Sequence, residues 1–205
     1  MKGAADQRPS ILIDGAHHAR ELTSVSQVMY TMIRLLHKYL NNDSEVKRIL
    51  SISGIFFVPI VNQDGYSVIS NTYATDGYLS EIRKNQRNDI QCTIYDNIGV
   101  DLNRNYGYGW GADNSGSSSR PCEEDYRGEY AFSEPETQAI RDFVVSHPQL
   151  KIALNFHAWG NLFVIPFNYS EDRNDFELIS KFAGAAAFYD DVWTQGGMPT
   201  NNVKG

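Results

Sequence analysis

Two short segments, far apart in the chain, carry residue types that bind zinc. His18 and Glu21 lie three positions apart in the segment Gly-Ala-His-His-Ala-Arg-Glu, and His157 follows an apolar run. A catalytic zinc ion takes three such protein ligands and keeps a fourth position open for water. The spacing alone is a weak signal because short motifs also arise by chance, and a simple loop ion pair between His18 and Glu21 explains it about equally well.

The sequence around the first segment predicts a strand followed by a helix. Residues 10–14 have the composition of a short buried strand that ends at a glycine. Ser24 and Gln27 have the spacing of a capping box, which predicts a long amphipathic helix over about 25–40. The candidate ligand pair would therefore lie in a loop at the carboxyl end of a strand, where α/β sheets build their sites.

The rest of the chain continues this alternation of strands and helices. Further strands are predicted at residues 55–61, 152–156 and 162–167, and further helices at residues 133–146 and 175–188. Turn residues at 62–65 end one strand, Ser133 and Glu136 form a second capping box, and the polar segment 72–127 predicts ordered functional loops. This order predicts a single α/β domain with a mixed, mostly buried β-sheet flanked by helices.

Composition and charge limit the classes of partner. The 205 residues are 41% hydrophobic and 21% charged, which suits one domain with an ordinary core. The net charge of −7 has no basic stripe beside it, so nucleic acid is not expected as a partner. No apolar run is long enough to span a membrane. The first residues have no apolar core and so do not read as a signal peptide.

Seven motifs occur in the order seen in zinc metallocarboxypeptidases, and the chain resembles the A/B branch of that family. They are Gly-Ala-His-His-Ala-Arg-Glu (15–21), Asn-Gln-Asp-Gly-Tyr (62–66), Arg-Lys-Asn (83–85), Gly-Val-Asp-Leu-Asn-Arg-Asn-Tyr (99–106), Pro-Cys-Glu-Glu-Asp-Tyr-Arg-Gly (121–128), Phe-Ser-Glu-Pro-Glu (132–136) and Asn-Phe-His (155–157). The stretch 100–108 is especially similar to the bacterial carboxypeptidase T type. The resemblance covers residues 11 to about 167.

The resemblance implies one Zn²⁺ ion per chain, held by His18, Glu21 and His157. It also implies that Asp101 orients the first ligand histidine, because such a carboxylate fixes the tautomer of a ligand histidine and strengthens its bond to the metal. Without the resemblance, Asp101 would read as a surface aspartate at a strand end.

The resemblance further implies that the substrates are the carboxyl termini of peptides and proteins. Asn103 and Arg104 match the residues that clamp the terminal carboxylate, a task for which a planar guanidinium is well suited. Arg83 matches the residue that polarises the scissile carbonyl and stabilises its oxyanion, and Arg20 matches a further substrate-binding arginine. Any one of these arginines alone would read as a solvated surface charge.

Cys92 and Cys122 are the two cysteines of the chain. From the residues alone, a reduced intracellular pair is the simpler interpretation. The resemblance implies that they form a disulfide bond and that the protein is secreted.

The resemblance also predicts a domain truncated at both ends. In the family, a helix and strands precede the segment that matches Ile11, and a carboxy-terminal portion follows the segment that ends at Gly205, so residues 1–205 are expected to be a partial peptidase domain. A protein partner that covers the exposed sheet edges is expected.

In the family, the missing carboxy-terminal portion carries the general-base glutamate. After His157 only Glu171 and Glu177 remain, and neither has the surrounding motif. The expected function is that of a metallocarboxypeptidase whose 205 residues alone are inactive. The alternative is a non-catalytic relative that binds zinc or peptide carboxyl termini, or has a structural role. A serine esterase is disfavoured because the Gly-x-Ser-x-Gly elbow is absent from the sequence.

Overall fold

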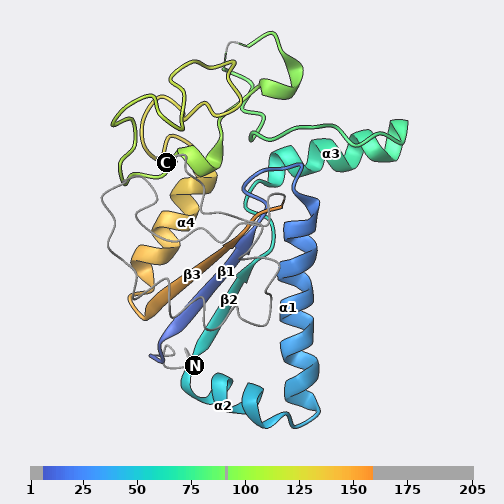
Figure 1. Ribbon diagram of the computed structural model, residues 1–205, viewed down its shortest axis with the longest axis vertical. Helices are drawn as coiled ribbons and strands as arrows, with labels where there is room; N and C mark the ends of the chain where they lie inside the picture. The colour runs from blue at the N-terminus through green and yellow to red at the C-terminus, as the bar shows by residue number, and fades with distance from the viewer. Residues whose placement is uncertain (1–6, 91, 159–205) are drawn as a thin grey trace, which may run out of the picture.

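The computed structural model describes residues 7–90 and 92–158 (Figure 1). Three parallel strands form a sheet in the order β2-β1-β3, with bounds β1 (Ser10–Gly15), β2 (Gly54–Val58) and β3 (Leu150–Phe156). Within these described residues, four α-helices accompany it: α1 (Leu22–Leu40), α2 (Ser44–Ile52), α3 (Gln63–Asp76) and α4 (Pro135–Ser146). The expected α/β class is therefore confirmed, and every strand pairing in the described part is parallel. The strand predicted at 162–167 and the helix predicted at 175–188 lie outside the described residues.

Helices α1 and α4 flank the sheet (Figure 1). Phe143 of α4 packs edge-on against Phe56 of β2, whose register partner in β1 is Leu12. On α1, Val28 is fully buried, and its Cγ2 would lie 3.1 Å from a Cβ added at Gly15. Glycine at the end of β1 thus lets α1 approach the strand closely.

Helix α1 begins at Leu22, earlier than predicted, and the capping role assigned to Ser24 is wrong. The Ser24 hydroxyl instead donates to the carbonyl of Glu21 at 2.6 Å and accepts from the backbone N–H of Ala16 at 2.9 Å. The N-cap residue is Glu21, and its side chain makes no capping bond. The Glu21 carboxylate instead contacts His18 and His157, so this side chain is not available to cap the helix.

Helix α4 begins at Pro135, so the capping box predicted for Ser133 and Glu136 is also wrong. Proline supplies the first helical turn, where its missing N–H costs nothing. The N-cap residue is Glu134, and its fully buried carboxylate accepts from Asn85 at 2.8 Å and from the Ser133 hydroxyl at 2.5 Å. This end of the helix is therefore held by contacts with other loops.

Residues 62–65 were predicted to be a turn, but they open helix α3. The Asn62 side chain accepts from the backbone N–H of Gly65 at 3.0 Å, and the helix ends at Asp76, where Gly77 caps it with a left-handed φ of 67°. Helix α2 was not predicted either. Asp43 caps it by accepting from Val46 N at 3.0 Å.

Strand β2 ends earlier than predicted, and the expectation that it is buried on both faces is wrong: each of its residues is only partly buried. Within the described residues, β2 and β3 are both edge strands, because β1 lies between them. Edge position explains the partial burial.

The loops predicted at 72–127 begin later than expected, because α3 runs to Asp76, and the rest of this segment matches the prediction. Two single-turn 3₁₀ helices, Tyr95–Asn97 and Leu102–Arg104, are its regular elements, and its loops gather beyond the carboxyl ends of the strands (Figure 1). Asn105 holds them together: its Nδ2 donates to the carbonyl of Arg127 at 2.9 Å and to the Ser133 hydroxyl at 2.8 Å, and its Oδ1 accepts from Thr137 at 2.7 Å. Hydrogen bonds to the buried Asn105 side chain therefore order the loops beyond the sheet. Within the described residues, no helix is long and apolar enough to span a membrane.

Candidate metal centre

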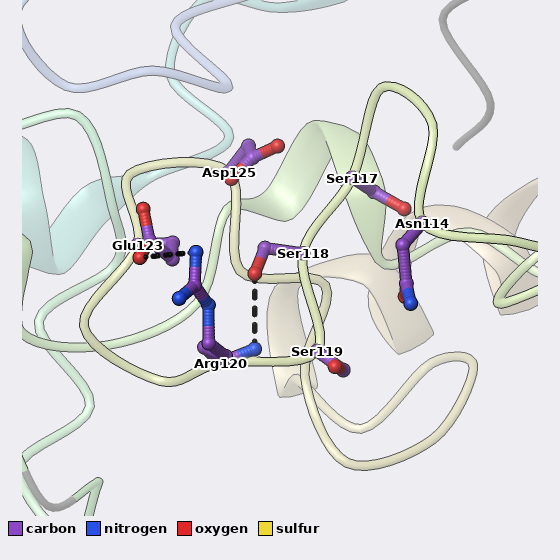
Figure 2. Close-up of a pocket in the computed structure, with 7 residues that line it drawn as sticks. All are labelled: Asn114, Ser117, Ser118, Ser119, Arg120, Glu123 and Asp125. Atoms are coloured by element: carbon purple, nitrogen blue, oxygen red, sulfur yellow. Dashed lines mark hydrogen bonds and ion pairs between the residues drawn. The ribbon is translucent and has the colours of Figure 1, made fainter.

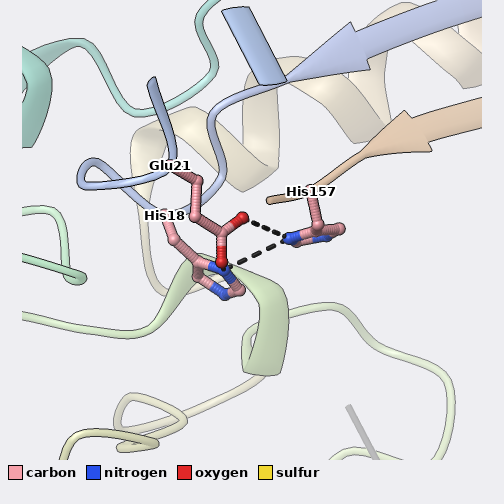
Figure 3. Close-up of side chains that lie close together, drawn as sticks. All are labelled: His18, Glu21 and His157. Atoms are coloured by element: carbon pink, nitrogen blue, oxygen red, sulfur yellow. Dashed lines mark hydrogen bonds and ion pairs between the residues drawn. The ribbon is translucent and has the colours of Figure 1, made fainter. Parts of the chain in front are cut away.

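Three side chains converge at the carboxyl edge of the sheet, as Figure 3 shows. One Glu21 oxygen lies 2.7 Å from His18 Nδ1, and the other lies 2.8 Å from His157 Nδ1. The two Nδ1 atoms are 3.2 Å apart. The structure therefore brings together the three residues that the sequence singled out as zinc ligands.

The strand register explains why these residues meet. Gly15, at the end of β1, pairs with Phe156 of β3, so the residues that follow both strands leave the sheet side by side. After Gly15 the chain turns sharply at Ala16, whose φ is 52°. The loop then brings His18 back over the sheet edge, where its side chain is 4% exposed.

Asp101 lies behind this cluster. Its fully buried carboxylate is 3.2 Å from His18 Nε2 through Oδ1, and the same oxygen accepts from the backbone N–H of Asn103 at 2.9 Å. Burial alone would raise the pKa of Asp101, but His18 and Arg83 together hold this pKa far below its usual range. Asp101 is thus an ionised carboxylate facing the ring nitrogen of His18 that points away from Glu21.

The charge states within the cluster follow from its contacts. Burial lowers the pKa of His18, but the close carboxylates of Asp101 and Glu21 outweigh it, so the pKa is raised. Burial raises the pKa of Glu21, but the hydrogen bonds to His157 and His18 outweigh it, so this pKa is lowered well below its usual range. Glu21 is therefore ionised, as a metal ligand must be.

The donor set fits zinc. Two imidazole nitrogens and a carboxylate oxygen are a ligand combination of catalytic zinc sites, and the three ligand atoms lie within 4.8 Å of one another. Tetrahedral bonds of about 2.0–2.1 Å place ligand atoms about 3.3 Å apart. The two Nδ1 atoms, at 3.2 Å, already have this separation, whereas each Glu21 oxygen lies closer to one histidine, at 2.7 and 2.8 Å. Within residues 7–90 and 92–158, this is the group of His, Cys, Asp and Glu side chains placed to hold a metal ion.

Arg83 contacts Asp101 rather than the open side of the cluster. Its Nε and one terminal nitrogen donate to Asp101 Oδ2 at 2.9 and 2.8 Å, and its side chain is 13% exposed. Asp101 therefore pairs with His18 through one oxygen and with Arg83 through the other.

The remaining predicted substrate residues lie around the cluster. Asn103 Nδ2 is 3.4 Å from His157 Nε2, so this amide borders the candidate ligands. Arg104 donates to the carbonyl of Gly116 at 2.6 Å, and burial lowers its pKa. Arg20 pairs with Glu124 at 2.5 Å. Each of these arginines has a protein partner in this structure.

Several buried polar residues near the site were not singled out from the sequence. Lys84 is fully buried, donates to the carbonyls of Pro121 and Glu123 at 2.7 and 2.8 Å, and has its pKa lowered by burial to about 8. His17, which was given no ligand role, is 3% exposed and hydrogen-bonded on both ring nitrogens. Neither periodicity nor spacing signals these contacts, because each joins segments far apart in the chain.

The expected disulfide between Cys92 and Cys122 is present. The neighbouring Asn97 side chain donates to the carbonyl of Cys122 at 3.0 Å. The disulfide bond therefore ties the loop of Cys92 to the loop whose Pro121 and Glu123 carbonyls accept from Lys84.

A polar pocket of about 440 Å³ lies in a separate loop region (Figure 2). Arg120 pairs with Glu123 at 2.8 Å on its wall and donates its backbone N–H to the Ser118 hydroxyl at 3.0 Å. Its lining is Asn114, Ser117, Ser118, Ser119, Arg120, Glu123 and Asp125. None of the candidate zinc ligands borders it.

The parallel sheet thus carries a His-Glu-His cluster at its carboxyl edge with a buried aspartate behind it, and this is the donor set of a catalytic type of zinc site. The chain matches the family model described as zinc carboxypeptidase over residues 2–196 and belongs to that family. It is 32% identical over 175 residues to carboxypeptidase B from Astacus astacus, and the matched region covers 85% of this chain and 53% of that protein. It is also 32% identical over 184 residues to human carboxypeptidase A1, and the matched region covers 88% of this chain and 41% of the human protein. The chain thus spans about half the length of these relatives.

Solved structures agree with this assignment. A structure of thrombin activatable fibrinolysis inhibitor matches with a TM-score of 0.74 and 27% identity, covering 96% of this chain and 47% of that one. Carboxypeptidase A from Helicoverpa armigera matches with a TM-score of 0.70 and 27% identity, and the match covers 90% of this chain and 42% of that chain. The fold is therefore that of the carboxypeptidases.

Proposed function

We propose that this chain is part of a zinc-dependent metallocarboxypeptidase that removes carboxy-terminal residues from peptides and proteins. The observation that carries the proposal is the convergence of His18, Glu21 and His157 on one point, with Asp101 behind them. Residues 1–205 are then part of a single peptidase domain. Family membership supports the class of activity, and the cluster supplies the ligand set that this activity needs.

Each residue of the cluster has a separate task in this proposal. His18, Glu21 and His157 hold the zinc ion, one per chain. When bound, zinc lowers the pKa of a water molecule and polarises the scissile carbonyl. Asp101 keeps the proton of His18 on Nε2, so that Nδ1 is free to act as a ligand.

Substrate binding falls to the surrounding polar residues. Asn103 and Arg104 would bind the terminal carboxylate, and the closeness of Asn103 to His157 supports its position at the cluster's edge. Arg20 would contact the substrate further from its end. Arg83 would stabilise the oxyanion with N–H groups other than the two that bond to Asp101, since a guanidinium carries five.

Partners and location are part of the same proposal. A relative, bovine thrombin-activatable fibrinolysis inhibitor, has been solved in complex with tick carboxypeptidase inhibitor. We infer that this chain also meets protein carboxyl termini, and that a further protein segment covers its sheet edges. The disulfide Cys92–Cys122 supports secretion, because such bonds persist in oxidising compartments.

The general base is proposed to lie outside these 205 residues. Glu171 and Glu177 follow His157, and neither lies in a motif of the family. General-base catalysis contributes about 10²–10⁴-fold to rate, so these residues alone should bind zinc and turn over peptides negligibly.

The experiment measures zinc and hydrolysis in the same preparations. The chain should hold one zinc ion, His157→Ala should lose it, and the exposed His37→Ala should keep it as the matched control. A longer chain that includes the missing glutamate should cleave peptides with free carboxyl termini and spare their amides. Zinc retained fully in His157→Ala contradicts the ligand set. Zinc and peptide binding without cleavage by the longer chain favours the non-catalytic alternative.

A further inference from the structure

Beside the candidate ligands lies a hydrogen-bonded polar chain of four residues, Asp14, His17, Tyr106 and Asn155, of which Asp14 and His17 are buried. We propose that this chain, centred on His17, positions the zinc ligands. The inference rests on the proposed function, because it assumes that His18, Glu21 and His157 hold the metal. His17 is a positioning residue in this account and touches neither the metal nor the substrate.

His17 is hydrogen-bonded through both ring nitrogens. Its Nε2 is 2.7 Å from the Tyr106 hydroxyl, and its Nδ1 is 2.7 Å from Asn155 Nδ2. The second hydrogen of the Asn155 amide goes to Asp14 Oδ1. The His17 ring also lies against the ring of His157, with centroids 6.1 Å apart.

The donors and acceptors fix the state of His17. The Asn155 amide nitrogen can only donate, so His17 Nδ1 must accept and be unprotonated. The proton therefore lies on Nε2, which donates to the Tyr106 oxygen. The imidazole is neutral and has one defined tautomer, so it acts as a rigid link between its two neighbours.

This link joins the three segments that carry the site. His17 directly precedes His18 in the ligand loop. Asn155 lies two residues before His157 at the end of β3. Tyr106 ends the motif that carries Asp101. A shift of any one of these segments would thus move the others through the hydrogen bonds of His17.

The simpler interpretation is that His17 is an ordinary buried histidine that contributes only stability. The two interpretations differ in what a folded variant does to the metal. His17→Phe keeps a ring but removes both hydrogen bonds, whereas His17→Gln keeps one donor and one acceptor. Tyr106→Phe removes the hydroxyl alone. Tyr78→Phe, whose native side chain is 57% exposed, is the matched control.

The test uses this chain, with zinc alone as the probe. Its zinc affinity is measured by competition with a chromophoric chelator. The visible absorption of the Co²⁺-substituted protein reports coordination geometry, and circular dichroism checks folding. His17→Phe should weaken zinc binding about 10–100-fold and shift the Co²⁺ bands. His17→Gln and Tyr78→Phe should stay within about twofold of the unsubstituted chain.

The double variant decides between positioning and simple stability. Adding Tyr106→Phe to His17→Phe should cost no further affinity, because both remove the same link. If His17→Phe folds and binds zinc with unchanged affinity and Co²⁺ bands, the inference is overturned. If His17→Phe does not fold, unchanged affinity in Tyr106→Phe overturns it instead. An unsubstituted chain that binds no zinc overturns the proposed function together with this inference, and so is distinguished from the other outcomes.

Discussion

Among single residues, Asp101 links the proposed zinc ligands to Arg83. Its two oxygens divide between His18 and Arg83, so the orientation of a proposed metal ligand and the position of the arginine proposed to stabilise the oxyanion depend on one buried carboxylate. Breaking one partner of a buried pair is more damaging than losing both, because an uncompensated charge remains. A substitution of Asp101 should therefore affect both His18 and Arg83.

We expect Asp101→Asn to lower zinc affinity by about 10–100-fold, because His18 loses the partner that fixes its tautomer. The same change should destabilise the fold by about 3–5 kcal/mol, since the Arg83 guanidinium stays largely buried without a counter-charge. Chelator competition and denaturant unfolding measure the two effects. Asp142→Asn is the matched control, because the Asp142 side chain is 67% exposed. Equal zinc affinity in the two variants would contradict this role.

The lowered pKa of Lys84 should make the stability of the fold depend on pH. Burial lowers its pKa from 10.5 to about 8, so between these values the unfolded chain binds more protons than the folded chain. Stability contributed at this residue therefore rises as pH increases from about 8 towards 10.5, because the cost of burying the charge is relieved. The free energy of unfolding of the protein, minus that of Lys84→Met, should rise across this window. A difference that is flat or falls with pH would contradict the burial of a charged lysine.

At the scale of elements, the site depends on how closely α3 approaches the loops that carry its residues. A Cβ added at Gly65 would lie 2.6 Å from the carbonyl of Lys84 and 2.8 Å from Ala19 Cβ. Lys84 follows Arg83, and Ala19 follows His18. A glycine inside this helix thus lets α3 pack directly under both segments.

We expect Gly65→Ala to destabilise the fold. Alanine gains about 1 kcal/mol of helix propensity over glycine, but overpacking a close contact with backbone costs about 1–3 kcal/mol or more, so the clash should win. Gly77→Ala is the comparison, because nothing lies within 4 Å of its added Cβ and only the φ of 67° opposes it, at about 1–2 kcal/mol. Thermal unfolding measures both. A more stable Gly65→Ala variant would show that α3 can move away at little cost.

The sequence predicted some of these elements and missed others for physical reasons. Strands β1 and β3 were predictable because their apolar runs are local stretches of sequence, whereas the meeting of His157 with His18 and Glu21 was expected from the resemblance of the motifs. The start of α1 was not, because Ser24 bonds to the ligand loop instead of capping the helix. The buried Lys84 and Glu134 were not either, because their partners come from segments more than 35 residues away. Long-range polar contacts leave no periodic trace in a sequence.

At the scale of the whole molecule, the described residues expose apolar surface on one long helix. Ile33, Leu36 and Leu40 of α1 are 57%, 58% and 68% exposed. They recur at helical spacing and so form one stripe along α1, the helix drawn in blue beside the sheet (Figure 1). Together with the edge strands β2 and β3, this stripe is the kind of surface that recruits other protein segments.

We expect the isolated 205-residue chain to self-associate for this reason. The double change Ile33→Lys and Leu36→Lys should reduce association, because it places two charges within the stripe. Val145→Lys is the matched control, since Val145 is 75% exposed but lies on α4. Sedimentation velocity measures the distribution of species. A monomeric unsubstituted chain, or an equal effect of the control, would contradict a role for the α1 stripe.

X-ray absorption at the zinc edge shows directly whether His18, Glu21 and His157 hold one zinc ion. We expect one zinc per chain with two imidazole nitrogens at about 2.0–2.1 Å and a carboxylate oxygen at about 2.0–2.2 Å. We also expect this spectrum to disappear in the double variant His18→Ala, His157→Ala. A zinc environment without imidazole, or the same spectrum in the double variant, would contradict the account.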